Sequence, residues 1–150
     1  MEHGLPVMRL TLIFVVCILF PSCLRAQGPE RALVLVANAH SVIQRLSPDE
    51  ARKLYLGMPM IVDSQRVHPL LNNTDPVVQE MFMQKIMFMS TPAYERQILS
   101  RVFRTGGTRP PVYTEIRDLS KALERDPAAV TYLPHDLAAA LPGIKIVGEP

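Results

Sequence analysis

Cysteine is scarce in this sequence of 150 residues, and its two cysteines, Cys17 and Cys23, both lie among the first 26 residues. The remaining chain therefore cannot form a disulfide and offers no thiol nucleophile, so its stability must come from packing. Net charge is also nearly absent, because residues 27–150 carry 14 Lys and Arg against 13 Asp and Glu. A chain so close to neutral has no strong overall field to attract nucleic acid or another polyanion.

The sequence also lacks the motifs of common catalytic and nucleotide-binding sites. It contains neither the G-x-x-x-x-G-K-[ST] spacing of a P-loop nor the G-x-G-x-x-G spacing of a dinucleotide-binding fold, and it has no G-x-S-x-G nucleophile elbow. His40, His68 and His135 stand apart, without a Cys, His or Glu companion at metal-ligand spacing. These absences predict a protein that is not an enzyme, binds no metal and uses no cofactor.

The N-terminal segment has the composition of an export signal. A run of 11 residues, apolar except for Thr11, covers positions 10–20 and is followed by small and polar residues. A helix needs about 20 apolar residues to span a bilayer, so this run predicts a signal peptide over residues 1–26 rather than a membrane-spanning helix. Cleavage after Ala26 and lipidation at Cys23 are both open, and residues 27–150 are expected to form one domain in the periplasm or another exported location.

Alternating strand and helix signals predict an α/β domain. The segment 31–38 is a short apolar run rich in Leu and Val, which is typical of a buried strand. Ser47, Pro48 and Glu50 form a capping box that begins a helix, and Gly57 ends it. Further along the chain we expect paired strands over 58–71, helices over 75–89, 90–104 and 114–125, strands over 128–134 and 143–148, and a short helical segment over 136–141. The expected architecture is a small mixed sheet covered by helices.

Four methionines lie close together in the second predicted helix, at Met81, Met83, Met87 and Met89. Thioethers bind Cu(I), but residues two apart on a helix point in different directions, so only Met83 and Met87 share a face. Two ligands make a weak copper site, and we interpret the methionines as packing residues or as a partner surface. Helical spacing places Met81, more than Met83, in a core stripe with Val77, Val78, Phe82, Ile86 and Met89.

The stretch SRVFRTGGTRPPVY, residues 100–113, follows the third predicted helix. Gly106 or Gly107 can end this helix in a left-handed conformation, and Pro110 and Pro111 prevent its continuation. A second interpretation stays open, because glycine backbone amides beside hydroxyl and arginine side chains can also bind an anion. The candidate donors are Thr105, Gly106, Gly107, Thr108 and Arg109.

Local positive charge surrounds this loop, in a stretch with no acidic residue between Glu95 and Glu115. Arg101 and Arg104 lie three apart on the helix, and Arg96 and Arg109 flank them. We expect Arg101 and Arg104 on the face opposite a core stripe of Tyr94, Ile98, Leu99, Val102 and Phe103. That charged face is either solvated or binds an anion or an acidic partner.

Several segments together resemble a family of short exported proteins related to the phosphate-binding components of ABC transporters. The matching segments are LSPDEARKLYLG, DPVVQEMF, RVFRTGGTRPP and LSKALERDPAAVTYLP, within residues 32–148. The resemblance implies a fold like a single lobe of a type II periplasmic binding protein. The positions that match are Leu46, Ser47, Glu50, Leu56 and Gly57 in the first helix, Thr105, Gly106, Pro110 and Pro111 in the central motif, and Asp126, Pro127 and Tyr132 near the end of the chain.

The sequence departs from that family where the resemblance implies an anion site. The full-length phosphate binders carry Ser-Gly-Thr at a helix N-terminus, whereas this chain has NNTDP over 72–76, so only Thr74 is carried over. Asp75 brings a negative charge to this position, and Pro76 lacks an N–H donor. Thr131 also stands where the family has a glycine.

Two functions remain as hypotheses. The resemblance implies a non-catalytic solute-binding component of an ABC transporter for phosphate or another oxyanion. Its anion site would comprise Thr74, Thr105, Gly106, Gly107, Thr108 and Arg109. The alternative is an envelope interaction module that has lost ligand binding and contacts a membrane-protein partner. The match of motifs favours the first function, and the departure at 72–76 favours the second.

The export hypothesis makes a direct prediction about the mature N-terminus. In the protein isolated from its native envelope, we expect the chain to begin at Gln27 or at a diacylated Cys23, because signal peptides are removed during export. Mass spectrometry of the N-terminal peptide distinguishes the two outcomes. A folded protein that still begins at Met1 would contradict export through a cleaved signal.

Overall fold

In the computed structural model, which describes residues 32–150, the sheet is built around β1 (Leu33–Asn38). β1 pairs antiparallel with β7 (Ala129–Pro134) on one side and with β8 (Ile144–Gly148) on the other, while β4 (His68–Pro69) runs parallel to β7. The order across the sheet is β4-β7-β1-β8. All of β1 is buried, which explains why the run LVLVAN is almost continuously apolar instead of alternating.

The chain after β4 forms a separate sheet of two strands beside β7. β5 (Leu71–Asn72) runs parallel to β6 (Val112–Tyr113). The Leu70 N–H donates to the Val130 carbonyl of β7 at 2.8 Å, and the next N–H along the chain donates to the Pro111 carbonyl before β6 at 2.9 Å. Neither the parallel pairing of β5 nor the strand β6 was expected from the sequence, because a strand of two residues carries no periodic signal.

The paired strands expected over 58–71 form a smaller hairpin than predicted. Its strands are β2 (Ile61–Val62) and β3 (Gln65–Arg66), which pair antiparallel. Asp63 and Ser64 form the turn with φ of 46° and 66°, the left-handed region in which Asp is better tolerated than most residues.

The predicted helices are confirmed, with small differences at their ends. The structure contains α1 (Pro48–Tyr55), α2 (Pro76–Phe82), which continues into the π-helix η1 (Met83–Met87), α3 (Thr91–Thr105), α4 (Ile116–Arg125) and α5 (His135–Ala140). The predicted capping box of α1 is also present. The Ser47 N–H donates to Oε2 of Glu50 at 2.9 Å, and the Glu50 N–H donates to Oγ of Ser47 at 3.3 Å. The Ser47 hydroxyl also donates to Oε2 of Glu50, at 2.7 Å, and the two hydrogen bonds that Ser47 donates to this carboxylate lower the pKa of Glu50.

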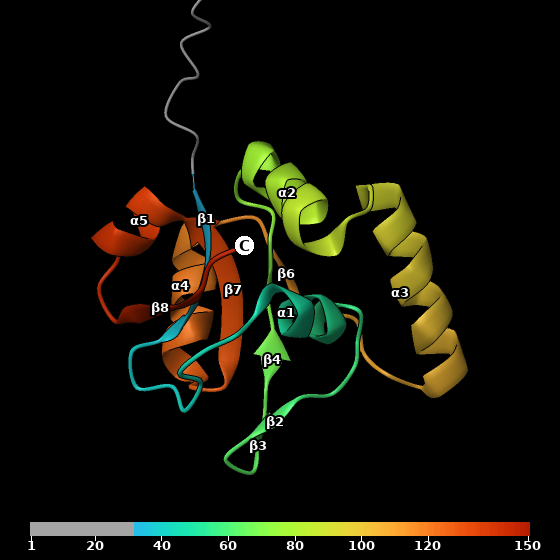
Figure 1. The fold of residues 1–150 in the computed structure, drawn as a ribbon, viewed down its shortest axis with the longest axis horizontal. Helices are drawn as coiled ribbons and strands as arrows, with labels where there is room; N and C mark the ends of the chain where they lie inside the picture. The colour runs from blue at the N-terminus through green and yellow to red at the C-terminus, as the bar shows by residue number, and fades with distance from the viewer. Residues whose placement is uncertain (1–31) are drawn as a thin grey trace, which may run out of the picture. The chain divides into compact units, whose positions relative to one another are not determined.

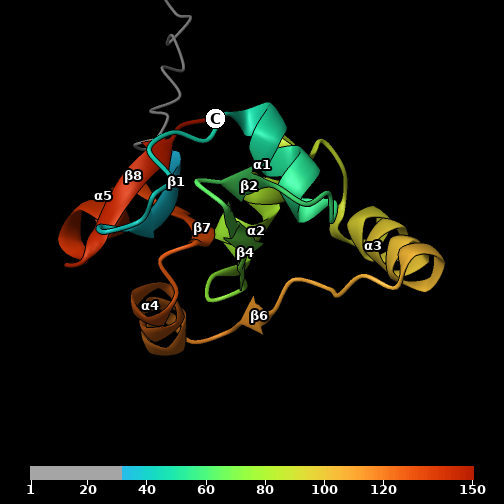
Figure 2. The ribbon, with the colours of Figure 1, turned by 90° about the horizontal axis from the view of Figure 1, so that it is seen from below.

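Helices cover both faces of the sheet (Figure 1). Leu33, Leu35 and Ala37 of β1 face the larger core, which includes side chains from α1, α2, η1 and α3. Val34 and Val36 face a smaller core with side chains of α4 and α5. Figures 1 and 2 both place α3 at the margin of the fold, on the side far from α5 and β8. The alternation along β1 therefore divides the interior into two packed layers.

An aromatic cluster lies in the larger core. The rings of Phe82 and Tyr132 stack with their centroids 3.7 Å apart, and Tyr55 meets Phe82 edge-on at 4.7 Å. Backbone groups satisfy the phenols: the Tyr132 hydroxyl donates to the Asn72 carbonyl at 3.0 Å, and the Tyr94 hydroxyl donates to the Tyr55 carbonyl at 3.0 Å. Burial raises the pKa of Tyr55, Tyr94 and Tyr132 well above the ordinary tyrosine value, so all three stay neutral.

The expected core stripe of the methionine helix is confirmed at Val78, Phe82 and Ile86, which are buried, but it is wrong at its edge. Met83 and Met87 are completely buried, whereas Met81 is only half-buried and Val77 is 58% exposed. The predicted stripe holds for an α-helix over the whole segment, but residues 83–87 form a π-helix. In a π-helix, residues four and five apart share a face, so the buried face shifts toward Met83 and Met87. Their thioethers are used for packing.

This correction predicts how two methionine substitutions affect stability. Met83→Ala should lower the free energy of unfolding by about 2–5 kcal/mol, because it leaves a cavity in a closed core. Met81→Ala should cost clearly less, since its side chain already contacts solvent. Urea unfolding of both variants measures the difference. Equal losses for the two variants would contradict the shifted register.

Candidate functional site

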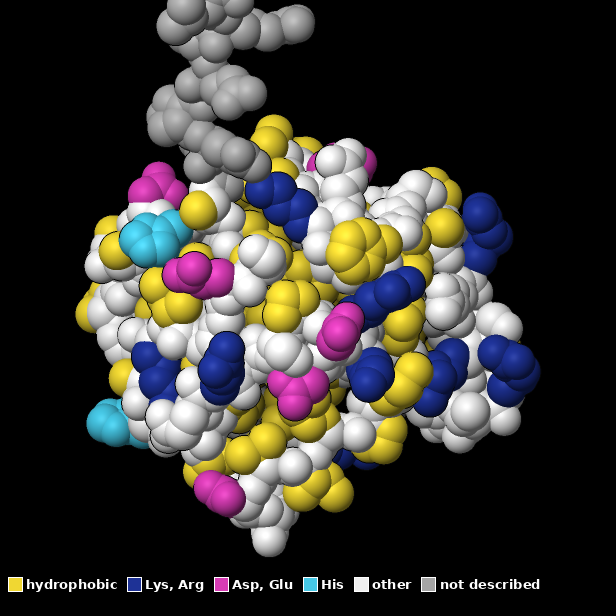
Figure 3. Space-filling model, in the orientation of Figure 1, with side chains coloured by type: hydrophobic (Ala, Val, Ile, Leu, Met, Phe, Trp, Pro, Cys, Tyr) yellow, Lys and Arg dark blue, Asp and Glu magenta, His cyan; other side chains and the backbone are white. Residues whose placement is uncertain are grey.

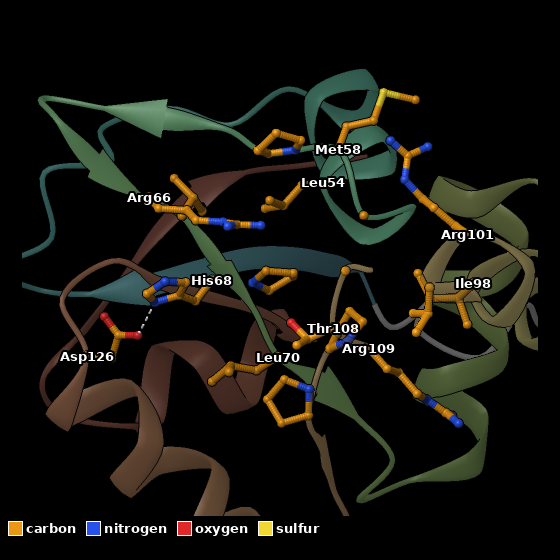
Figure 4. A pocket seen from close by; sticks show the side chains of 18 of the residues that line it. Leu54, Met58, Arg66, His68, Leu70, Ile98, Arg101, Thr108, Arg109 and Asp126 are labelled. Atoms are coloured by element: carbon orange, nitrogen blue, oxygen red, sulfur yellow. Dashed lines mark hydrogen bonds and ion pairs between the residues drawn. The ribbon is translucent and has the colours of Figure 1, made fainter. Parts of the chain in front are cut away.

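A groove of about 550 Å³ opens at the edge of the sheet where β4, β6 and β7 begin (Figure 4). Its walls come from the ends of α1, α3 and α4, from the strand segment 66–70 and from the loop 107–111. Apolar side chains such as Leu54, Leu70 and Ile98 form part of the lining. The polar and charged side chains that line it are Arg66, His68, Arg101, Thr105, Thr108, Arg109, Tyr113, Arg125 and Asp126.

Glycines end two of the helices that form the groove. Gly57 with φ of 85° follows α1, and Gly106 with φ of 68° caps α3, which confirms the predicted left-handed cap at Gly106. Gly57 also allows a close approach, because a Cβ at this position would lie 3.1 Å from Cδ of Arg101. The absence of a side chain at Gly57 thus leaves room for Arg101 to pass the end of α1.

The groove carries more positive than negative charge. Nδ1 of His68 contacts Oδ2 of Asp126 at 2.6 Å, so the one carboxylate in the lining already has a partner. Among residues 32–150, Arg66, Arg101 and Arg125 form no ion pair. In Figure 4, Arg66 and Arg101 extend from opposite walls of the groove. Arginines without an acidic partner are suited to bind a carboxylate or an oxyanion.

Arg109, the arginine expected from the sequence to bind an anion, already has an acidic partner. Arg109 forms an ion pair with Glu95 on α3. In Figure 4 its side chain points away from Arg66 and Arg101. Arg109 is therefore less available to a ligand than Arg101, although both line the groove.

The glycine loop uses some of its donors to end α3. The Gly106 N–H donates to the Val102 carbonyl, and Oγ1 of Thr105 donates to the Arg101 carbonyl, both at 2.9 Å. Thr105, Gly107, Thr108 and Arg109 of the predicted site line the groove, whereas Gly106 does not. Most of the loop therefore lies at one groove. The Gly106 N–H and the Thr105 hydroxyl, however, already donate to carbonyls of α3.

The remaining predicted residue, Thr74, lies at the other edge of the sheet, beyond the carboxyl end of β5. Its hydroxyl and its N–H both donate to Oδ1 of Asn72, at 2.7 and 3.0 Å. Asp75 caps α2 by accepting from the Val77 N–H at 2.8 Å. The structure therefore separates Thr74 from the loop 105–109, and the six predicted residues do not form one site.

The edge at which Thr74 lies carries acidic residues at its helix starts. Open α/β sheets usually bind ligands beyond the carboxyl ends of their strands, often at helix N-termini. In this chain the helices that begin there carry Asp75 at the start of α2, Glu115 and Asp118 at the start of α4, and Asp136 in the first turn of α5. These carboxylates occupy the positive ends of the helices and oppose a bound anion.

Arg66 and Arg125 were not expected at the site from the sequence, and Arg101 lies on the face of α3 opposite to the one predicted. Arg101 shares the inner face with Tyr94 and Ile98, because these residues follow at spacings of four and three. The expected stripe was too wide: Leu99 is 45% exposed and Phe103 is 86% exposed. The spacing of Tyr94, Ile98 and Arg101 could have placed Arg101 on the inner face of α3. No short sequence pattern indicates that positions 66, 101 and 125 lie around one groove.

Helix polarity limits what the groove can bind. α1, α3 and α4 all direct their C-terminal ends toward it, and these ends carry partial negative charge. The arginines offset that charge, so a bound anion needs several of them at once. Within the described residues, no three His, Cys, Asp or Glu side chains gather where they could hold a metal ion.

Comparisons with known proteins support the fold. No protein-family model and no curated protein sequence matches the chain. Among solved structures, an ABC-type phosphate transport receptor from Vibrio cholerae matches with a TM-score of 0.55 at 10% identity, over 77% of this chain and 45% of the receptor. A protein described as a "possible phosphate binding protein" from Planctomyces limnophilus matches with a TM-score of 0.52 at 10% identity, over 79% of this chain and 45% of its own length.

These likenesses establish the architecture. The chain spans less than half the length of either solved structure it matches, as expected for one lobe. At 10% identity the likeness concerns the fold alone. The predicted fold class is therefore confirmed: an α/β unit with a small mixed sheet covered by helices, similar to a single lobe of a type II periplasmic binding protein.

Proposed function

We propose that this protein is an exported, non-catalytic binding protein that takes phosphate or a similar oxyanion in the groove, as a solute-binding component of an ABC transporter. The observation that carries the proposal is the presence of Arg66, Arg101 and Arg125 around one groove without acidic partners among the described residues. The descriptions of the two structural neighbours, a transport receptor and a binding protein, support binding rather than catalysis.

The arginines come from three different elements. Arg66 ends β3, Arg101 lies in the last turns of α3, and Arg125 ends α4. An oxyanion between them would accept charge-assisted hydrogen bonds, each worth about 1.5–3 kcal/mol. Thr108, which also lines the groove, offers a hydroxyl donor beside them. The helix C-termini and the solvent reduce this gain, so we expect weak affinity.

The alternative function is an envelope interaction module that has lost ligand binding. One observation favours it: the carboxyl edge of the sheet, where such folds usually bind ligands, carries Asp75, Glu115 and Asp136 at its helix starts. An anion would be repelled there. A protein of this fold could then act through its outer surface alone.

The oxyanion proposal predicts ligand-dependent stability and a specific role for Arg101. Phosphate at about 100 times its dissociation constant should stabilise the protein by about 2.7 kcal/mol, which thermal melts detect. Arg101→Ala should weaken binding by about 10- to 150-fold, because one charge-assisted interaction is lost. Arg109→Ala should have a smaller effect, since Glu95 already holds Arg109.

Arg117→Ala serves as the matched control, because Arg117 is an exposed arginine of α4 outside the groove. Arg125→Ala tests the site without disturbing the contact between Arg101 and Gly57. Calorimetry with phosphate and with sulfate gives the affinities. If millimolar amounts of both anions leave the melting curve unchanged, the oxyanion site is rejected and the interaction module becomes the better account.

A further inference from the structure

Helix α3 has a second apolar face that the fold does not use. Leu99 and Phe103 lie one turn apart, and their side chains are 45% and 86% exposed. They lie on the side of the helix away from Tyr94 and Ile98, which are buried in the core. Figures 1 and 2 show α3 at the margin of the fold, so this side faces outward. We call Arg96, Leu99, Phe103 and Arg104 the outer face of α3.

Two arginines flank the exposed apolar pair. Arg96 and Arg104 are both exposed, and Arg104 Nε donates to the Ser100 carbonyl of its own helix at 3.3 Å, which leaves its terminal nitrogens available. No Asp or Glu occurs over residues 96–114, and Glu95 just before this stretch is paired with Arg109. In Figure 3, Lys and Arg side chains gather over α3 on the right of the view. The outer face therefore combines apolar area with unbalanced positive charge.

We propose that the outer face of α3 docks an acidic protein segment. Such a partner would cover Phe103 and Leu99 with its own apolar side chains and place carboxylates against Arg96 and Arg104. Interfaces of this kind derive most of their affinity from one or two buried aromatic or arginine side chains, which this face supplies. The opposite charges would set the orientation and accelerate association.

This inference does not rest on the oxyanion site. The side of α3 that lines the groove carries Ile98, Arg101 and Thr105, and the outer face carries different residues. A ligand in the groove and a partner on the outer face could therefore be bound together. Loss of either activity would leave the other measurable.

The charge and the small apolar area of the outer face favour a protein segment over two other occupants, a second copy of this chain and a membrane surface. A second copy docking through the same face would bring Arg96 and Arg104 against their own counterparts, and like charges repel. A membrane-surface helix needs a broad apolar face, and even a single acyl chain gives only marginal membrane binding. Leu99 and Phe103 bury less apolar surface than such a chain.

Site-specific photocrosslinking in the native cells tests the proposal. The full chain would carry a photoreactive phenylalanine analogue at position 103, and a control would carry it at position 77, since Val77 is also an exposed apolar residue but lies on α2. We expect position 103 to crosslink to one protein, at a segment rich in Asp and Glu. The double substitution Arg96→Glu and Arg104→Glu should lower the crosslink yield at least 10-fold with no change in the melting temperature of the purified protein.

The other outcomes overturn the proposal. These are a crosslink to lipid, a crosslink to a second copy of this chain, a crosslinked segment without acidic residues, or a yield at position 103 no higher than at position 77. Adding phosphate should not change the yield, because the groove lies on the other side of α3. The melts with Arg101→Ala report on the groove separately, so failure of one proposal is distinguishable from failure of the other.

Discussion

Two strands that lie 60 residues apart in the sequence are joined by a buried polar contact between Asn72 and Tyr132. The Tyr132 hydroxyl accepts from the Asn72 N–H at 3.2 Å and donates to the Asn72 carbonyl at 3.0 Å, and Nδ2 of Asn72 donates to the Tyr132 carbonyl at 2.9 Å. Both residues are almost completely buried, so a broken contact would leave polar atoms without water. Phe82 stacks on the Tyr132 ring and brings α2 to the same point. The placement of β5 against β7, and of the loops at both ends of β5, depends on this contact.

The two edges of the sheet have acquired opposite electrostatic character. Beyond the carboxyl ends of β5, β6 and β7, acidic residues such as Asp75 stand at the helix starts, and the donors of the Thr74 turn are used internally. At the amino ends of β4, β6 and β7, three helix C-termini meet around arginines that have no acidic partner among the described residues. An anionic ligand therefore finds its favourable field at the edge that open α/β folds seldom use. This reversal is the physical basis of the proposed groove function.

Helix α3 contributes to both proposed activities, because one of its sides lines the groove and the other is exposed to solvent. Its inner side packs Tyr94 and Ile98 into the core and directs Arg101 to the groove. Its outer side exposes 86% of Phe103, so this side chain buries little apolar surface in the isolated fold. A helix at the margin of a sheet buries only a narrow stripe, so the opposite side is free to change without loss of stability. The proposed solute-binding and docking roles therefore use different residues of the same helix.

The sequence by itself determined the elements, because their signals lie within a few residues of each other: the capping box at Ser47 and Glu50, the left-handed cap at Gly106, the continuous apolar run of β1. The motif resemblance also anticipated an α/β lobe, and the pattern of glycine, hydroxyl and arginine residues pointed to the loop 105–109, most of which lines the groove. Only the tertiary structure decided which residues meet.

It shifted the buried methionine face from Met81 to Met83 through a π-helix, separated Thr74 from the loop, and added Arg66 and Arg125 to the groove. These outcomes depend on packing between elements that are distant along the chain. Two-residue strands such as β4 and β6 and single side chains facing a groove leave no periodic pattern in the sequence.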